Sequence, residues 1–439
     1  MSTRRRFRLA TIGLGAASAM VLSGCLSGGG SDNNSSGGES KGDGTVTILG
    51  AFGGAEKEAF VASLKEFESS SGITIDYTDD QDFATTIKAK VNSGAAPDIG
   101  LFPQPGGLLE LSDDITPLGD VLDVNAIKST LIPGFLEATT KGGNIYGAPM
   151  RMAVKSLVWY PKDAYDETGL SKEPASIQEL QGITDKLKAD TKAPWCMGWE
   201  SDQATGWVGT DWLEEYVLRV NGPDVYDQWV KHEIPFNDPQ IVKALDEFGK
   251  IAKTNGEVFG GAKGILNTGF ADAMNPAFKA KPDCMLMRQG NFATGFFPDQ
   301  VQADLDGSVG TFVFPPFQGG YTGQPILGGG DLAAAFNGGD SDVKQVMEFL
   351  TSDKFGGEWA AAGGWLSPHK TFDASQYADE TTRNIATLAA DADVFRFDAS
   401  DLMPKEVGSG TFWTGMVDWV SGESSQKTLD AIEASWPKS

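Results

Sequence analysis

The sequence predicts an α/β protein with parallel, doubly wound sheets, divided between two lobes. The first observation is the order strand, helix, strand, helix, strand between residues 45 and 102. Short links between these segments imply a parallel sheet whose helices cover its faces. The second observation is the length of 439 residues, which suggests more than one ordinary hydrophobic core.

The first part of the chain alternates predicted strands with predicted helices. The strands are alternating or continuous apolar runs, at residues 45–51, 73–77, 98–102 and 148–160. Apolar residues at helical spacing predict helices at Phe60, Leu64 and Phe67 and over residues 83–91, 161–170 and 176–189. Ser176, followed three residues later by Glu179, is a capping pattern for the last of these helices. The run 148–160 is long enough to cross from one lobe to the other.

The second part of the chain continues the mixed pattern without an internal repeat. Strands are expected at residues 193–198, 283–289, 311–316 and 332–336. Helices are expected at residues 211–221, 240–254, 270–281, 343–350 and 357–362, and after Trp413.

Strand ends are the first candidates for a binding site. Ligands of doubly wound proteins gather where strands end and helices begin. In the first lobe these turns are Phe52-Gly53-Gly54, Thr78-Asp79-Asp80 and Phe102-Pro103-Gln104-Pro105.

The stretch CMGWESDQATGWVG, residues 196–209, has the composition of a sugar-binding cleft. The flat ring of Trp207 suits the C–H face of a pyranose, and Glu200 and Ser201 can hydrogen-bond to its hydroxyl groups. Core packing is the alternative for any single tryptophan, and we expect it for Trp195. The stretch contains no histidine or lysine, which favours binding over catalysis.

The N-terminus is predicted to be a signal peptide, residues 1–24, with a lipobox. A cluster of arginines precedes an apolar run of 14 residues, Leu9 to Leu22, which is too short to span a bilayer. Leu22-Ser23-Gly24-Cys25 resembles a bacterial lipobox, so Cys25 is the expected lipidation site. Residues 25–44, rich in Gly, Ser and Asn, should form a flexible tether. Residues 3–7 also resemble a twin-arginine signal, and the general secretory route stays open.

The charge balance excludes two classes of partner. Removal of the signal peptide lowers the basic residues from 35 to 31 against 60 acidic residues, a net charge of −29. Such acidity argues against binding of nucleic acid and of anionic lipid surfaces. It permits a neutral ligand.

The cysteine count predicts a disulfide. With Cys25 lipidated, Cys196 and Cys284 remain as a pair in an exported protein. A bond between them closes a loop of 88 residues and contributes roughly 4 kcal/mol in the chain-entropy model. Two buried free thiols are the alternative. His232 and His369 lack metal-ligand spacing, so we expect no metal and no cofactor.

A secreted, lipid-anchored glycoside hydrolase is the alternative function, because paired carboxylates can cleave glycosides. With 60 acidic residues, some carboxylates fall near strand ends by chance. The chain has no Gly-x-Ser-x-Gly elbow, no His-Glu-x-x-His helix and no phosphate-binding loop. We therefore expect a binding protein and not an enzyme.

Residues 45–439 resemble the extracellular solute-binding proteins of carbohydrate ABC importers. The motifs that carry this resemblance are Ser93-Gly94-Ala95-Ala96-Pro97-Asp98-Ile99, Asn144-Ile145-Tyr146-Gly147-Ala148-Pro149, Trp159-Tyr160-Pro161-Lys162-Asp163 and Glu433-Ala434-Ser435-Trp436. Cys196-Met197-Gly198, Ala204-Thr205-Gly206-Trp207, Thr210-Asp211-Trp212 and Asp398-Ala399-Ser400-Asp401 are similar to the α-glucoside-binding subgroup.

The resemblance implies a periplasmic-binding-protein-like fold of two lobes that close on a mono- or oligosaccharide. Lobe 1 would comprise residues 45–155 and 317–368, and lobe 2 residues 156–316 and 369–439. Three crossings would join them, near residues 153–158, 313–317 and 366–372. The implied partners are the saccharide and the membrane permease of the importer, and the receptor would act as a monomer on the extracellular face of the cell membrane.

The resemblance also implies ligand contacts at the strand ends of both lobes. In this sequence the corresponding residues are Gly53, Gly54, Glu56, Asp79, Asp80, Gln104, Glu200, Ser201, Trp207, Gln289, Asn291, Phe292, Gly329, Asp331, Trp365 and Trp413.

Overall fold

The computed structural model of the chain describes residues 41–392 and 394–437. By its internal contacts the chain separates into residues 1–38 and residues 39–439, and all described residues belong to the second unit. The predicted signal peptide, Cys25 and most of the tether lie outside the described residues. Among the described residues, no helix has the length and apolar character needed to cross a bilayer.

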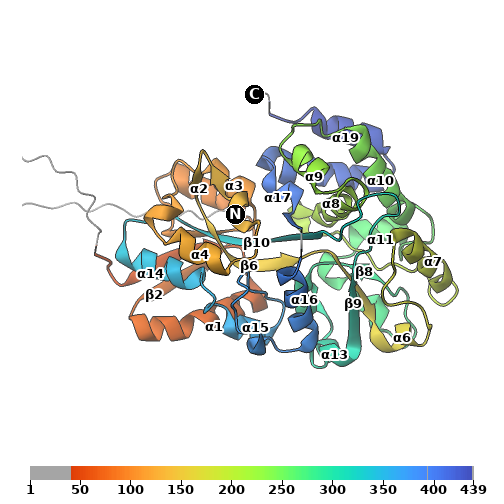
Figure 1. Cartoon of the computed structure of the whole chain (residues 1–439), viewed down its shortest axis with the longest axis horizontal. Helices are drawn as coiled ribbons and strands as arrows, with labels where there is room; N and C mark the ends of the chain where they lie inside the picture. The colour runs from red at the N-terminus through yellow and green to blue at the C-terminus, as the bar shows by residue number, and fades with distance from the viewer. Residues whose placement is uncertain (1–40, 393, 438–439) are drawn as a thin grey trace, which may run out of the picture. The chain divides into compact units, whose positions relative to one another are not determined.

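The larger sheet has six strands and confirms the predicted parallel start. Strand β1 pairs in parallel with β2 on one side and with β3 on the other. Strand β10 is antiparallel to β3 and to β6, which runs beside it in Figure 1, and parallel to β11. The strands are β1 (Thr45–Gly50), β2 (Thr74–Asp79), β3 (Ile99–Phe102), β6 (Ala148–Val154), β10 (Ile326–Ala335) and β11 (Phe395–Phe397).

The smaller sheet is built on a central strand β7 (Leu157–Pro161), with β8 (Met287–Arg288) and β9 (Val309–Val313) antiparallel to it. A separate hairpin consists of β4 (Thr140–Lys141) and β5 (Asn144–Ile145). Only Lys155 and Ser156 separate β6 from β7, so the chain passes from one sheet to the other at these two residues.

The helices cover both sheets, with α1, α2, α3 and α14 against the larger one and α8, α9, α10, α18 and α19 packed together beyond it (Figure 1). They are α1 (Gly54–Ser71), α2 (Phe83–Asn92), α3 (Pro105–Glu110), α4 (Val124–Thr130), α5 (Phe135–Ala138), α6 (Lys162–Asp166), α7 (Ile177–Leu187), α8 (Trp207–Asn221), α9 (Pro223–Val230), α10 (Pro239–Ala252), α11 (Gly261–Asn267), α12 (Asp299–Gln302), α13 (Leu305–Ser308), α14 (Ser341–Leu350), α15 (Gly357–Ala362), α16 (Glu380–Ala390), α17 (Ala399–Leu402), α18 (Trp413–Val420) and α19 (Ser425–Glu433).

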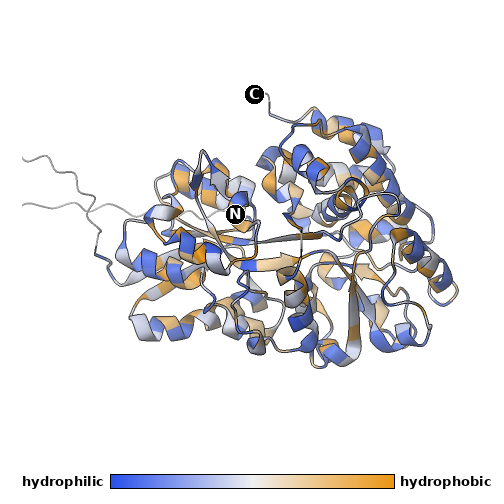
Figure 2. Cartoon of the chain, viewed as in Figure 1, coloured by the Kyte–Doolittle hydropathy of each residue, from blue (hydrophilic) through white to orange (hydrophobic). Residues whose placement is uncertain are grey.

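Local sequence signals fix several of these elements. The Ser176 hydroxyl accepts a hydrogen bond from the Glu179 amide at the start of α7, and the Glu179 carboxylate accepts one from the Ala175 amide. This reciprocal pair satisfies amides that the first turn of a helix leaves free. Figure 2 shows that hydrophobic and hydrophilic residues are interleaved along the helices.

Two sequence-based expectations are wrong. The helix expected over residues 270–281 is replaced by 3₁₀ turns at Phe270–Asp272 and Asn275–Phe278. Pro276 explains the difference, because it has no amide hydrogen and its ring disrupts the interior of an α-helix. The strand expected over residues 193–198 is an extended segment that forms only isolated bridges, from Trp195 to Val258 and to Leu286.

The disulfide between Cys196 and Cys284 is present, with an S–S distance of 2.07 Å. Both cysteines are buried. The bond joins the extended segment around Trp195 to the chain just before β8, so the stretch of residues 196–209 is held against the smaller sheet.

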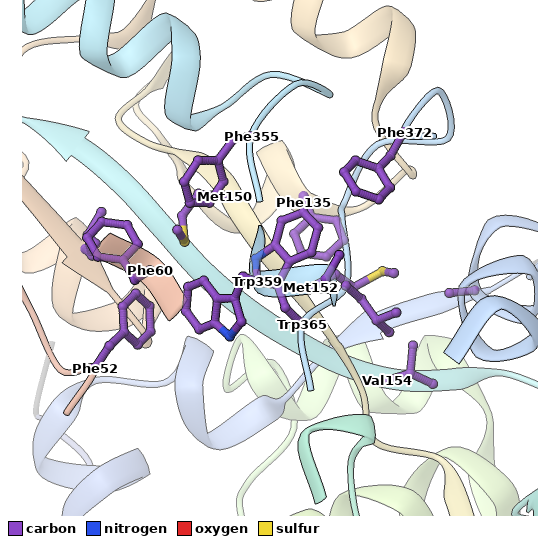
Figure 3. Packing of buried hydrophobic residues seen from close by; sticks show 14 of the residues in the cluster. Phe52, Phe60, Phe135, Met150, Met152, Val154, Phe355, Trp359, Trp365 and Phe372 are labelled. Atoms are coloured by element: carbon purple, nitrogen blue, oxygen red, sulfur yellow. The ribbon is translucent and has the colours of Figure 1, made fainter. Parts of the chain in front are cut away.

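Most of the large aromatic side chains belong to the cores. Trp195 and Trp212 pack edge to face at 5.3 Å between ring centroids, which confirms core packing for Trp195. Trp199 is also fully buried. Around the larger sheet, Phe52, Phe60 and Trp359 interlock, as Figure 3 shows.

Candidate functional site

A cavity of about 340 Å³, lined by both apolar and charged residues, lies where the larger sheet meets helices α8, α17 and α18. Its walls combine strand ends, helix starts and two short aromatic turns. The lining residues are Ala51, Glu56, Pro103, Gln104, Arg151, Ala153, Lys155, Ala204, Trp207, Asp211, Phe270, Phe292, Phe296, Gly329, Gly330, Asp331, Asp398, Ser400, Asp401 and Trp413.

Arg151 joins three elements at one wall of the cavity. Its guanidinium donates from Nη1 to Glu56 of α1 at 2.7 Å and pairs through Nε with Asp331 of β10 at 2.7 Å. The same group lies over the rings of Phe52 and Trp359, at 5.0 and 5.1 Å from their centroids. Burial raises the pKa of Asp331, and the charge of Arg151 opposes that rise. Arg151 thus fixes the positions of both carboxylates.

Lys155 also lines the cavity, at the passage from β6 to β7. Its ammonium group donates to Asp211 of α8 at 2.9 Å and to Asp398, which precedes α17. Burial disfavours the charged lysine, but the two carboxylates outweigh this effect and hold the pKa of Lys155 well above its ordinary value. Lys155 therefore carries its charge and binds together three segments of the chain.

The acidic residues around Lys155 differ in their protonation. Burial raises the pKa of Asp211 and of Asp401 well above the usual range. Burial acts in the same direction on Asp398, but Lys155 and hydrogen bonds from neighbouring groups prevail and lower the pKa of Asp398. The negative charge that Lys155 stabilises therefore lies mainly on Asp398.

Asp211, Glu214 and Asp398 bring their oxygens within 4.8 Å of one another, a spacing that a metal ion could use. The Lys155 ammonium already contacts Asp211 and Asp398 and supplies a positive charge there. Burial also raises the pKa of Glu214, which favours its neutral form. We therefore assign this cluster to Lys155 and not to a metal.

Aromatic side chains form the remaining wall. The Trp207 indole N–H donates to the Ser201 hydroxyl at 2.9 Å, and the ring packs edge to face against Phe270 with centroids 5.2 Å apart. The Lys155 ammonium lies 5.5 Å from the centroid of Trp207. The Trp413 indole N–H is buried and has no hydrogen-bond partner among the described residues. A ligand hydroxyl could satisfy this donor.

Seven of the residues expected from the sequence line the cavity. They come from β10 of the larger sheet, from the starts of α1, α8 and α18, from the residue before α3 and from the 3₁₀ turn at Asn291–Phe296: Glu56, Gln104, Trp207, Phe292, Gly329, Asp331 and Trp413.

Other expected residues lie outside the lining. Gly53 and Gly54 form the start of α1, where Gly54 adopts a φ of 54°. Asp79 pairs with Lys57 at 2.6 Å, and both side chains are partly exposed. The Asp80 carboxylate accepts hydrogen bonds from the Asp82 amide and the Thr86 hydroxyl, and so organises the turn before α2.

Glu200 and Ser201 lie behind the cavity wall. The Glu200 carboxylate accepts a hydrogen bond from the Asp202 amide at 2.9 Å, and its backbone pairs with Gly269. The Ser201 hydroxyl supports the indole of Trp207. In this conformation both residues shape the turn that presents Trp207 and do not line the cavity themselves.

Gln289, Asn291 and Trp365 are buried structural residues here. The Gln289 side chain accepts a hydrogen bond from the Gly290 amide, and the Asn291 side chain accepts one from the Val154 amide at 2.8 Å. Trp365 is 1% exposed and belongs to the aromatic cluster of Figure 3. None of the three lines the cavity.

Sequence reasoning missed the charged residues that organise the cavity: Arg151, Lys155, Asp211, Asp398 and Asp401. A signal was present, because Arg151 and Lys155 interrupt a strongly apolar run, residues 148–160. Buried cations are costly unless they are paired, so such residues demand carboxylate partners. Their partners could not be identified from local patterns.

The chain matches a known protein family and two curated proteins over most of its length. Residues 53–356 match the family described as bacterial extracellular solute-binding protein. The chain is 40% identical over 395 residues to the osmoprotective compounds-binding protein GgtB of Synechocystis sp., covering 90% of this chain and 92% of that protein. It is 33% identical over 405 residues to the alpha-glucosides-binding periplasmic protein AglE of Rhizobium meliloti, covering 89% and 87%.

Solved structures show the same fold at low sequence identity. A chitin oligosaccharide binding protein aligns with a TM-score of 0.73 and 18% identity, covering 89% of this chain and 97% of that one. Maltose-bound MalE3 of T. maritima aligns with a TM-score of 0.67 and 17% identity, covering 89% and 98%.

The fold is therefore that of the periplasmic-binding-protein-like receptors, as the sequence predicted. The chain belongs to the bacterial extracellular solute-binding protein family. This is a family of extracellular binding proteins, which confirms the expectation of a receptor and sets aside the glycoside hydrolase.

Proposed function

We propose that this protein is the saccharide receptor of an ABC importer and that it captures an α-glucoside in the cavity described above. One observation carries the proposal: the same cavity is lined by the indoles of Trp207 and Trp413 and by the carboxylates of Glu56 and Asp331. Aromatic faces suit the C–H surfaces of a pyranose ring, and carboxylates accept hydrogen bonds from its hydroxyl groups. The name of the relative AglE supports the α-glucoside.

The volume of the cavity favours a short ligand. At about 340 Å³ it lies near the lower end of the range of roughly 300–1,000 Å³ found for small-molecule pockets. A monosaccharide or disaccharide fits this size better than a long oligosaccharide does.

Two lobes would close on this ligand. The resemblance implied lobes of residues 45–155 with 317–368 and of residues 156–316 with 369–439, with the third crossing near residues 366–372. Because β11 pairs with β10 of the larger sheet, we instead assign β11 to lobe 1 and propose the third crossing at Asp398, between β11 and α17. Contacts from both lobes stabilise the closed form by their differential affinity for it, and the membrane permease would recognise that form.

A lipid anchor at Cys25 and a tether over residues 25–44 would hold the monomeric receptor at the extracellular face of the membrane. The proposal rests on the lipobox-like sequence Leu22-Ser23-Gly24-Cys25. Mass spectrometry of membrane-extracted protein tests it, since a mature chain that begins at Cys25 with added acyl chains is the expected result.

Calorimetry with maltose, trehalose, sucrose, isomaltose and xylo-oligosaccharides tests the ligand class. We expect stoichiometric binding of at least one α-glucoside, and Trp207→Ala should weaken it at least tenfold, about 1.4 kcal/mol. Trp436→Ala is the matched control, because Trp436 packs on His232 and lies outside the cavity lining. Glu200→Ala, behind the wall, should change affinity less than Trp207→Ala does. Absence of binding across the panel would refute the proposal.

A further inference from the structure

The cations that line the cavity are already neutralised by the protein. Among the lining residues only Arg151 and Lys155 are basic, whereas Glu56, Asp211, Asp331, Asp398 and Asp401 are acidic. Arg151 is paired with Glu56 and Asp331, and Lys155 with Asp211 and Asp398. Each cation thus faces two carboxylates, and neither is left to bind an anion brought by a ligand.

Asp401 differs from the other carboxylates because it lines the cavity without a partner. In the part of the chain that the structure describes, its carboxylate makes no hydrogen bond and no ion pair. Its oxygen is the kind of group that accepts from a ligand hydroxyl or ammonium. The side-chain amide of Gln104 and the indole N–H of Trp413 are likewise without partners in the described residues.

We infer that the cavity selects its ligand by charge, accepting neutral saccharides and saccharides with an ammonium group beside Asp401 and rejecting those with a carboxylate or phosphate. The inference rests on the proposed saccharide receptor and adds the charge class of its ligand. An anionic sugar would leave water to enter a site where the carboxylates outnumber the cations. An ammonium group would instead stabilise the ionised form of Asp401 against the burial that raises the pKa of this carboxyl.

Protonation of some carboxyl groups does not free either cation. Burial raises the pKa of Asp211 and of Asp401, so each can hold a proton. Lys155 still lowers the pKa of Asp398, and Arg151 lies at 2.7 Å from both Glu56 and Asp331.

Matched sugars test the inference on the mature protein. Three series, based on maltose, trehalose and isomaltose, each contain the neutral sugar, a derivative with an amino group in place of one terminal 6-hydroxyl, and the corresponding glucuronate. In any series whose neutral sugar binds, calorimetry should show the amino derivative within tenfold of it and the glucuronate at least tenfold weaker. A glucuronate that binds within tenfold of its neutral sugar overturns the inference and leaves the proposed function standing.

Failure of the proposed function gives a different result. If no neutral or amino member of any series binds, and sucrose and the xylo-oligosaccharides also fail to bind, the saccharide receptor is refuted, and the charge inference falls with it. The two failures are therefore separated by the neutral sugars.

A variant locates the selectivity at Asp401. Asp401→Asn keeps the shape of the side chain but cannot ionise when an ammonium group approaches, so the ratio of amino-sugar to glucuronate affinity should fall at least tenfold. Asp202→Asn is the matched control, since Asp202 is exposed and outside the lining, and it removes one charge from the same protein. An unchanged ratio in Asp401→Asn, or an equal change in Asp202→Asn, overturns the assignment to Asp401.

Discussion

Replacement of Lys155 by methionine should destabilise the ligand-free protein strongly. The lysine side chain is 10% exposed, and its partners Asp211 and Asp398 are 1% and 2% exposed. Removal of one partner from a buried ion pair costs about 3–5 kcal/mol, because the remaining charge has no compensation. Methionine nearly matches the length of the lysine stem, so lost packing contributes little to this effect.

Thermal unfolding followed by circular dichroism measures the effect. An unfolding entropy of roughly 2.1 cal/mol/K per residue gives about 0.8 kcal/mol/K for a chain of about 400 residues. A loss of about 3–5 kcal/mol therefore lowers Tm by about 4–6 °C.

Lys57→Met is the matched control, because Lys57 pairs with Asp79 while 41% and 35% of the two side chains are exposed. Exposed pairs contribute about 0–1 kcal/mol, so this variant should lose about 1 °C at most. Asp398→Asn added to Lys155→Met removes the uncompensated charge and should recover part of the loss. Equal Tm values for Lys155→Met and Lys57→Met would show that the buried network does not act as we argue.

Two further predictions concern pH and the disulfide. Burial lowers the pKa of His369 from 6.5 to about 4, so stability is complete above pH 6.5 and falls as the pH drops towards 4, by about 2–3 kcal/mol. Urea unfolding of His369→Gln should show a shallower decline than the unaltered protein between pH 7 and 4.5, and equal declines would contradict the prediction. Cys196→Ala/Cys284→Ala opens a loop of 88 residues and should lose about 4 kcal/mol in the same assay without reductant. Unaltered stability would argue against the chain-entropy account.

Local patterns predicted the start of the larger sheet correctly. Strands β1, β2 and β3 and the capped helix α7 follow from apolar periodicity and from the Ser176 and Glu179 pair, which are signals within a few residues. The resemblance implied Glu56 and Asp331 as ligand contacts, and both line the cavity, Glu56 from the first turn of α1 and Asp331 from the middle of β10, where each pairs with Arg151.

Two residues that were expected to contact the ligand, Asp79 and Trp365, have other partners in this structure. Asp79 stands at the end of β2, but Lys57 on α1 binds it at 2.6 Å on a partly exposed surface. Trp365 follows a glycine pair, yet Phe355 and Phe372 pack against it in the core. Neither competing contact has a sequence signal, since both depend on how separate elements pack.

The sequence by itself determined the class of fold, the pairing of Cys196 with Cys284 and the tryptophan-rich segment that supplies Trp207. These features depend on periodicity, composition and cysteine count, which are properties of the linear chain. Tertiary structure alone decided that Lys155 meets Asp398, 243 residues away, and that both cations of the cavity are already paired. Electrostatic pairing acts through space, so the charge that the cavity offers to a ligand is known only when the strands and helices have been brought together.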